Sequence, residues 1–312
     1  MRWQIILGIL IVSLAMSACA VPDESAADGR LQVVATTGQI ADAVQNIGGD
    51  VVNLTNLLGP GIDPHTYVAT EGDLAVFQSA DVIFYNGLHL EAQLERVLEQ
   101  IGNNGDVTVR AVGEVIDPQA LLGWEPEQGF PYDPHIWNDV LLWRQAVEVV
   151  RDTLIEADPG NSAVYSRNAT AYLSELDALH TYIGAQVATI PSERRVLVTA
   201  HDAFGYFGQA YGFDVQAVQG ISTEAEAGAA DIQALANIII TQQVPAIFIE
   251  STISPRTIEA VQEAVRAGGH EVQLGGELFS DALGAPGSAA ETYIGMMRHN
   301  IDTIVAALAA TS

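Results

Sequence analysis

Strand-type and helix-type segments alternate through most of this 312-residue chain. The first strand segment reads LQVVATT (31–37), and a helix-period segment follows it and ends at a Gly-Gly pair (48–49). The same rhythm continues to residue 112 and restarts at residue 195. Strands that alternate with helices form parallel sheets with helices on both faces. The sequence therefore predicts an α/β fold.

One long segment interrupts this alternation. Residues 161–190 contain no proline and no strong helix breaker before Pro191, so at ~1.5 Å per residue they would form a helix of about 40 Å. The chain is also longer than one compact core usually holds. We therefore expect two α/β lobes, at 31–158 and 192–312, each with a parallel sheet flanked by helices. A connecting helix within 159–191 would join them.

The N-terminus has the plan of a signal peptide. Arg2 gives it a positive start, an apolar run follows at 5–16, and small residues precede Cys19, the only cysteine in the chain. The apolar run is short for a membrane span. Because MSAC resembles a bacterial lipobox, we expect residues 1–18 to be a signal peptide, Cys19 to be lipidated, and 19–30 to form a flexible tether. The alternative is a plain secretory signal with an incidental cysteine.

The charge of the chain argues against one class of partner. The formal net charge is −27, and all twelve basic residues are arginines. Such a surface repels polyanions, so we expect no nucleic-acid partner. A mature chain without further cysteines has no disulfides, so core burial alone must stabilise it.

Two histidines occur in the same local frame. GIDPHTY (61–67) and PYDPHIW (131–137) each place a histidine, His65 or His135, directly after an Asp-Pro pair. Proline fixes its own φ and restricts the residue before it. Both histidines should therefore lie on stiffened loops with an acidic neighbour two positions back. The alternative is two unrelated turns.

Two more candidate ligands follow strands in the second half of the chain. His201 comes directly after RVLVTA, and Asp281 lies just beyond the last strand, in GGELFSDALG. Ligands of open α/β sheets lie outside the carboxyl ends of the strands. If the lobes face each other, all four residues would meet in the cleft. Three imidazoles and a carboxylate suit Zn²⁺ and can accept Mn²⁺ or Fe²⁺. From spacing alone, hydrogen-bonded loop histidines remain the alternative.

Six segments of the chain resemble a known family. They read PGIDPHTY, ADVIFYNGLHLE, DPHIWND, VTAHDAFGYFGQAYG, PAIFIES and GGELFSDALG. They are similar, in this order, to segments of the metal-binding lipoproteins of ABC transporters, the cluster A-I or TroA-like family that delivers zinc or manganese. The resemblance runs from about residue 31 to the C-terminus.

The resemblance implies one divalent transition metal per chain as the transported ligand. Its ligands would be His65, His135, His201 and Asp281. Manganese-dedicated members commonly have glutamate where this chain has His201. Zinc-dedicated members commonly carry a long His/Asp-rich loop before the second ligand, where this chain has the segment GWEPEQGFPYDPH, which is acidic but has no extra histidines. Imidazole in place of carboxylate favours Zn²⁺, with Mn²⁺ next.

The resemblance also implies a place and a partner. The protein would be extracytoplasmic, at the outer face of the cytoplasmic membrane or in the periplasm. A lipid on Cys19 would anchor it to the membrane. It would work as a monomer that delivers its metal to an ABC permease.

Four acidic residues are candidates for orienting the ligand histidines through their second ring nitrogen: Asp63, Asp133, Asp202 and Glu250. The first three neighbour a ligand histidine and the last ends the strand PAIFIE, so turn shaping and buried capping are the alternatives. Of the remaining histidines, we expect structural roles for His89 and His299 and solvated positions for His180 and His270.

Two other functions compete with metal import. A secreted zinc hydrolase would need an open metal position, yet Asp281 would close the fourth one, and the chain has no H-E-x-x-H motif and no marked general acid or base. A surface adhesin would not need the four ligands. We therefore expect a non-catalytic protein.

Overall fold

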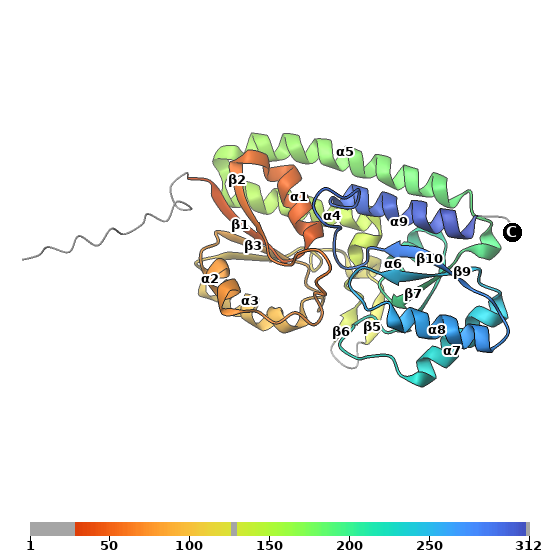
Figure 1. Ribbon diagram of the computed structural model, residues 1–312. Coiled ribbons are helices and arrows are strands. Elements are labelled where there is room, and N and C mark those ends of the chain that lie inside the picture. The colour runs from red at the N-terminus through yellow and green to blue at the C-terminus, as the bar shows by residue number, and fades with distance from the viewer. Residues whose placement is uncertain (1–28, 126–129, 310–312) are drawn as a thin grey trace, which may run out of the picture. The chain divides into compact units, whose positions relative to one another are not determined.

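The computed structural model describes residues 29–125 and 130–309, and Figure 1 shows the order of their helices and strands. The predicted signal peptide (1–18), Cys19 and most of the predicted tether lie outside the described residues. Within the described part of the chain, no helix is both long enough and apolar enough to cross a membrane.

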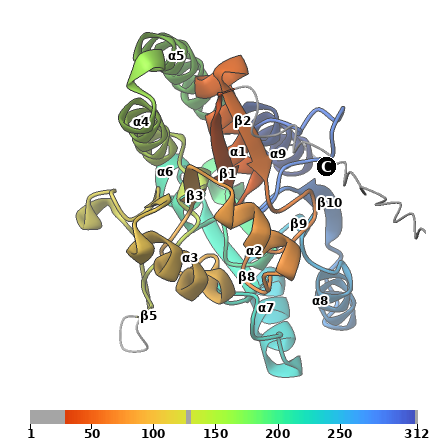
Figure 2. The same cartoon turned by 90° about the vertical axis from the view of Figure 1, so that its left-hand side faces the viewer.

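Four parallel strands form the N-terminal sheet, in the order β2-β1-β3-β4. They are β1 (Leu31–Ala35), β2 (Val52–Asn56), β3 (Val82–Tyr85) and β4 (Thr108–Ala111). Successive strand residues point to opposite faces. Val33 and Phe84 therefore pack with α1 (Gly38–Gly48), whereas Val34 and Ile83 pack with α2 (Glu71–Gln78) and α3 (Ala92–Asn104). Figures 1 and 2 show these helices on the two faces of the sheet.

Threonine side chains cap the first two helices. Thr37 accepts a hydrogen bond from the backbone of Ile40 at the start of α1. At the start of α2, Thr70 and Asp73 each accept the other's backbone N–H, which is a complete capping box. The capping box thus fixes the start of α2.

The middle of the chain forms a hairpin and two long helices. The antiparallel pair β5 (Gly123–Glu125) and β6 (Phe130–Tyr132) is followed by a 3₁₀ turn (Ile136–Asn138) and then α4 (Val140–Ala157). Helix α4 is an element additional to the predicted ones. The predicted long helix is confirmed as α5 (Ser162–Val187), which packs against α4 and runs alongside both sets of strands in Figure 1.

The second set of strands is also parallel. It comprises β7 (Val196–His201), paired with β8 (Asp214–Gln219), and β9 (Ala246–Glu250), paired with β10 (Gln273–Leu278). The helices around them are α6 (Gly205–Tyr211), α7 (Ala229–Gln242), α8 (Arg256–Ala267) and α9 (Tyr293–Leu308). Strand β7 lies beside β9. Val198 and Ile247 pack with α7 and α8, whereas Leu197 and Phe248 face the core shared with α6 and α9.

One cluster of buried side chains reaches across both sets of strands. It includes Val33 from β1, Leu176 from α5 and Ile301 from α9. The described chain from Leu31 onward forms one compact unit. The α/β fold with parallel sheets and one long helix is confirmed, and the exact boundaries of two lobes stay a prediction.

Candidate metal centre

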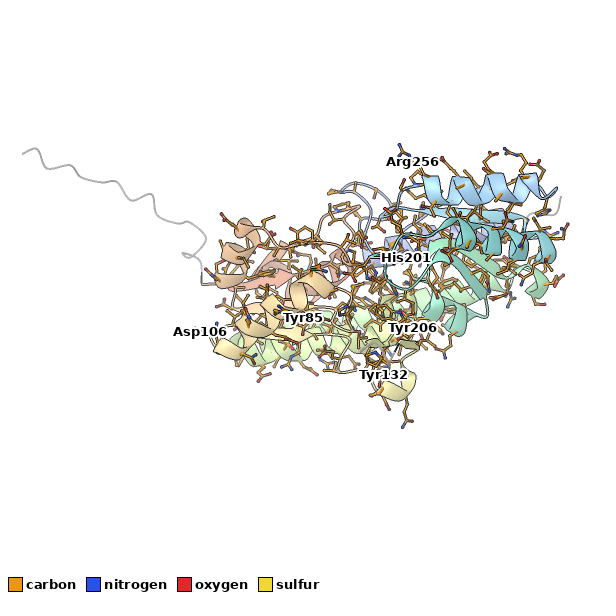
Figure 3. All side chains as sticks on the ribbon, turned by 90° about the horizontal axis from the view of Figure 1, so that it is seen from below. Tyr85, Asp106, Tyr132, His201, Tyr206 and Arg256 are labelled. Carbon is orange, nitrogen blue, oxygen red and sulfur yellow. The ribbon has the colours of Figure 1, made fainter. Side chains whose placement is uncertain are left out.

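The four predicted ligands meet at one buried point. His65 lies in the loop after β2, His135 precedes the 3₁₀ turn, His201 is the last residue of β7, and Asp281 follows β10 by three residues. One ligand atom from each lies within 4.8 Å of those of the other three. All four side chains are buried. In Figure 3, His201 lies toward the middle of the ribbon, where the colours of the two halves of the chain meet.

The facing atoms are spaced as ligands of one metal ion are. Nε2 of His201 lies 3.1 Å from Oδ2 of Asp281, and Nε2 of His135 lies 3.5 Å from Oδ1. Nε2 of His65 lies 3.3 Å from Nε2 of His135 and 3.7 Å from Oδ2 of Asp281. A tetrahedral ion with bonds of ~2.0–2.1 Å holds its ligand atoms ~3.3 Å apart. The cluster can therefore hold one metal ion.

The polar atoms of the cluster also lack other partners. Within the described residues, neither carboxylate oxygen of Asp281 accepts a hydrogen bond, and Nε2 of His201 has no hydrogen-bond partner. Buried polar atoms are nearly always paired, and leaving them unpaired is costly. Three imidazole nitrogens that converge on a carboxylate whose two oxygens accept no hydrogen bond from the described residues are the donor set that a transition-metal cation satisfies.

The two Asp-Pro-His frames form the same backbone contact. Oδ1 of Asp63 accepts the backbone N–H of His65 at 2.9 Å, and Oδ1 of Asp133 accepts that of His135 at 2.9 Å. Each aspartate thus closes a short turn over the proline and holds the histidine backbone in place. The repeated motif produces a repeated local structure.

Carboxylates orient two of the three imidazoles through Nδ1. Oδ1 of Asp133 lies 2.7 Å from Nδ1 of His135, and Oε2 of Glu250 lies 2.6 Å from Nδ1 of His201. Because an ionised carboxylate only accepts hydrogen bonds, the single proton of a neutral ring sits on Nδ1. Nε2 of that ring then has a lone pair that points into the cluster.

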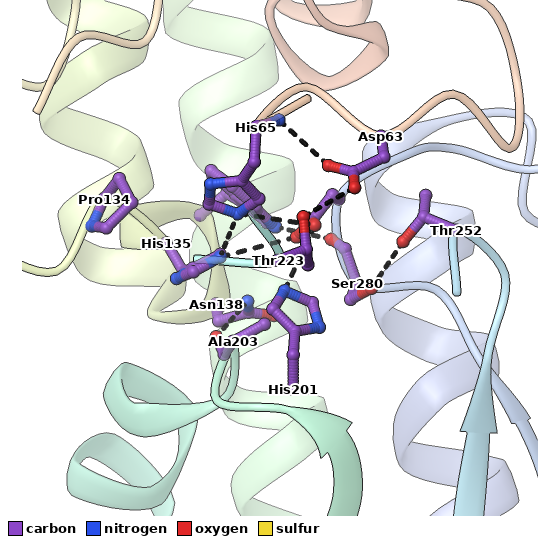
Figure 4. Close-up of polar contacts among 12 residues, drawn as sticks. Asp63, His65, Pro134, His135, Asn138, His201, Ala203, Thr223, Thr252 and Ser280 are labelled. Carbon is purple, nitrogen blue, oxygen red and sulfur yellow. Dashed lines mark hydrogen bonds and ion pairs between the residues drawn. The ribbon is translucent and has the colours of Figure 1, made fainter. Parts of the chain in front are cut away.

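The other two acidic candidates do not contact an imidazole Nδ1. Asp63 accepts hydroxyl hydrogen bonds from Thr66 and Thr223 instead. Figure 4 draws the one from Thr223. Asp202 neighbours His201 in sequence, but Glu250 occupies the ring nitrogen of His201, and burial raises the pKa of Asp202. Nδ1 of His65 has no hydrogen-bond partner among the described residues.

Burial and charge act in opposite directions on the pKa values of the cluster. Burial lowers the pKa of His65 to about 3, so its ring is neutral at physiological pH. Burial also lowers the pKa of His201, but the carboxylates of Glu250 and Asp281 outweigh it and raise that pKa well above its ordinary value. Burial opposes ionisation of Asp281 too, yet the imidazoles, His201 foremost, hold its pKa below its usual range. Asp281 is thus a buried negative charge within the cluster.

Residues that the sequence analysis did not single out tie the ligand loops together. The indole N–H of Trp137 donates to the carbonyl of Ser280 at 2.9 Å, next to Asp281. The side-chain amide of Asn138 donates to the carbonyl of Ala203 at 2.9 Å, close to His201. Figure 4 draws the Asn138–Ala203 contact. Both donors lie in the DPHIWND segment, but their acceptors are far along the chain, so no local pattern predicts these bonds.

The remaining histidines lie away from this cluster. His89 contacts Glu95 through Nδ1, and His299 contacts the carbonyl of Glu277. His180 and His270 are half-buried rather than solvated, because His180 pairs with the hydroxyl of Tyr211 and His270 with the carbonyl of Val244.

Comparisons of sequence find relatives along nearly the whole chain. The model of the family described as "Zinc-uptake complex component A periplasmic" matches residues 33–307. The zinc-binding protein TroA of Treponema pallidum is 50% identical over 286 residues, which are 92% of this chain and 91% of that protein. The manganese-binding lipoprotein MntA of Bacillus subtilis is 43% identical over 309 residues, 99% of this chain and 100% of that protein.

Solved structures match the fold as well. The periplasmic zinc-binding protein TroA of Treponema pallidum superposes with a TM-score of 0.87 at 49% identity, over 90% of this chain and 100% of that one. Fe(III)-bound YtgA of Chlamydia trachomatis gives a TM-score of 0.77 at 30% identity, over 88% of this chain and 96% of that one.

Proposed function

This chain belongs to the ZnuA family of periplasmic zinc-uptake components, and we propose that it is the extracytoplasmic metal-binding component of an ABC importer. It captures one divalent transition metal and delivers it to a membrane permease. The metal ligands are His65, His135, His201 and Asp281. Asp133 and Glu250 orient two of the imidazoles.

The observation that carries this proposal is the buried cluster of three imidazoles and one carboxylate. Asp281 is 2% exposed and the three histidines are 0% exposed. Its donor atoms face one another at 3.1 to 3.7 Å without hydrogen bonds from other described residues to Asp281. A cation is the partner that stabilises such an arrangement.

The ligand chemistry favours Zn²⁺, with Mn²⁺ next. Three nitrogen ligands suit Zn²⁺, whereas the harder Mn²⁺ prefers more oxygen ligands. The names of the relatives include both metals, since TroA is called zinc-binding and MntA manganese-binding. Competitive titration of Zn²⁺ against Mn²⁺ on metal-stripped protein decides between them.

A binding role fits the site better than catalysis. A catalytic zinc keeps one position open for water or substrate, whereas Asp281 here supplies the fourth donor. The relatives are named as metal-binding proteins, so neither the hydrolase nor the adhesin alternative gains support. We infer that the protein is not an enzyme.

The proposal includes the place of the protein in the cell. The family is described as periplasmic and MntA is named a lipoprotein. The protein therefore works outside the cytoplasm, with Cys19 as its lipid anchor and an ABC permease as its partner. It works as a monomer, because one chain supplies all four ligands.

Calorimetric titration of metal-stripped protein tests the assignment. The wild type should bind one metal ion per chain. His65→Ala and His201→Ala should each lose most of the affinity, because each removes a ligand. His180→Ala and His270→Ala are matched controls outside the cluster and should bind like the wild type. Equal losses in all four variants would contradict the assignment, and so would a wild type that takes up no metal.

A further inference from the structure

One of the three imidazoles is held differently from the other two. Asp133 and Glu250 fix the rings of His135 and His201 through Nδ1, but Nδ1 of His65 has no partner among the described residues. The hydrogen bond that holds His65 in its loop is the one from its backbone N–H to Asp63. The position of His65 therefore depends on the position of Asp63.

Asp63 is in turn held by a residue from the second half of the chain. The hydroxyl of Thr223 donates to Oδ2 of Asp63 at 2.6 Å, a short hydrogen bond of the length found with carboxylate acceptors. Thr223 follows β8, whose last residue, Gln219, pairs with His201. Figure 4 draws the contacts of Asp63 with both His65 and Thr223. A residue 160 positions away along the chain thus anchors the loop of His65.

The neighbour of Thr223 makes a second contact of the same kind. Oε1 of Glu224 accepts a hydrogen bond from Nε2 of Gln93 on α3 at 2.9 Å. The adjacent residues Thr223 and Glu224 therefore bond to two separate segments of the N-terminal half of the chain. These segments are the loop after β2 and helix α3. Both Gln93 and Glu224 are exposed, so their bond is the weaker of the two.

We propose that Thr223 is a positioning residue that holds the His65 loop closed over the bound metal and so sets the rate of metal release. This rests on the proposed function. For the metal to leave, at least one ligand must withdraw, and His65 is the imidazole whose Nδ1 has no partner among the described residues. Withdrawal of its loop requires the Thr223–Asp63 hydrogen bond to break. Loss of that bond should speed release and leave capture nearly unchanged, because capture begins from the open loop.

Stopped-flow kinetics on the full chain test this. Zn²⁺-loaded protein is mixed with excess chelator to measure release, and metal-stripped protein is mixed with Zn²⁺ to measure capture. In Thr223→Val the release rate should rise about threefold to tenfold, the range for loss of one hydrogen bond, with little change in capture. Thr223→Ser keeps the hydroxyl and should restore slow release.

Two further variants separate this role from a general structural one. Thr66→Val also removes a hydroxyl from Oδ2 of Asp63, but within the same loop, so its release rate should rise less than that of Thr223→Val. Thr241→Val removes a hydroxyl from the exposed face of α7 and should release metal like the wild type. If the wild type binds Zn²⁺ and Thr223→Val releases Zn²⁺ at the wild-type rate, this inference is overturned and the proposed function is not. Fast release from Thr223→Ser overturns it too, whereas a wild type that binds no metal overturns the proposed function as well.

Discussion

Glu250 holds both the ring and the backbone of His201. Its Oε2 lies 2.6 Å from Nδ1 of the ring, and its Oε1 accepts the backbone N–H of His201 at 2.9 Å. Oε1 also accepts the N–H of Ala200 at 2.7 Å. One buried carboxylate at the end of β9 therefore fixes the last two residues of β7 and the direction in which His201 presents Nε2.

Replacing that carboxylate should weaken metal binding. Glu250→Gln keeps the shape but puts an amide where the imidazole N–H and two backbone N–H groups need acceptors. Loss of such an orienting partner typically costs about 10- to 100-fold in metal affinity. Calorimetric titration with Zn²⁺ measures the loss. Glu277→Gln, an exposed carboxylate on β10, removes the same charge and should bind like the wild type. Equal affinities for the Glu250 variant and the wild type would contradict the role given to Glu250.

Two aspartates near ligand histidines should behave differently. Asp133 bonds to the ring of His135, whereas the ring nitrogen of His201 is taken by Glu250 rather than by Asp202. We expect Asp133→Asn to lose about tenfold or more in Zn²⁺ affinity and Asp202→Asn to lose much less. Competition with a Zn²⁺ indicator measures both. A larger loss in Asp202→Asn than in Asp133→Asn would reverse the assignment.

Much of the fold can be predicted from local sequence patterns. The strand segments and their helices follow hydrophobic periodicity, and the capping box at Thr70 needs only residues three apart. The start of α4 also has a local signal in the sequence, because Asp139 is its N-cap and its side chain accepts a hydrogen bond from the backbone N–H of Leu141. The middle of β10 is harder to predict, because Gly275 and Gly276 weaken the strand pattern and the pairing with β9 is irregular between Leu274 and Glu277.

Some of the side chains that support the candidate ligands cannot be predicted from local sequence patterns. Asp202 is adjacent to His201 in sequence, but successive residues at the end of a strand point in different directions. Glu250 reaches the ring because β9 lies beside β7. Thr223 likewise contacts Asp63 only through the tertiary fold. The candidate ligands could be predicted from motifs, whereas their supporting bonds needed the three-dimensional arrangement.

Metal should stabilise the folded protein. A ligand that binds only the native state adds about 4 kcal/mol at roughly a thousandfold excess over Kd. For a chain of this size, that raises Tm by about 6 °C. Thermal melts with Zn²⁺, with Mn²⁺ and with chelator measure the shift. Mg²⁺ prefers oxygen ligands and is a control that should leave Tm in place. A Tm that neither Zn²⁺ nor Mn²⁺ moves would count against a native metal site.

A buried carboxylate outside the metal cluster makes stability depend on pH. Glu91 is fully buried at the start of α3. It accepts hydrogen bonds from the hydroxyl of Thr36 at 2.6 Å and from the backbone N–H groups of Asn86 and Gly87 at 2.8 and 3.2 Å. Burial outweighs these bonds and raises the pKa of Glu91 to about 7 from its ordinary value of 4.5. The folded chain therefore binds a proton in a range where the unfolded chain has lost it.

The sign of the effect follows from that order of pKa values. Because the pKa of Glu91 is higher in the folded state, its stabilising contribution is complete below 4.5 and is lost as the pH rises through about 7. This loss amounts to about 3 kcal/mol in the free energy of unfolding. Glu91→Gln cannot titrate, so between about pH 5 and about pH 8 its unfolding free energy should fall less than that of the wild type. Urea denaturation of the metal-free proteins measures both slopes. Glu99→Gln, an exposed carboxylate on the same helix, should keep the wild-type slope. Parallel pH profiles for the wild type and Glu91→Gln would show that Glu91 is ionised in the fold throughout this range.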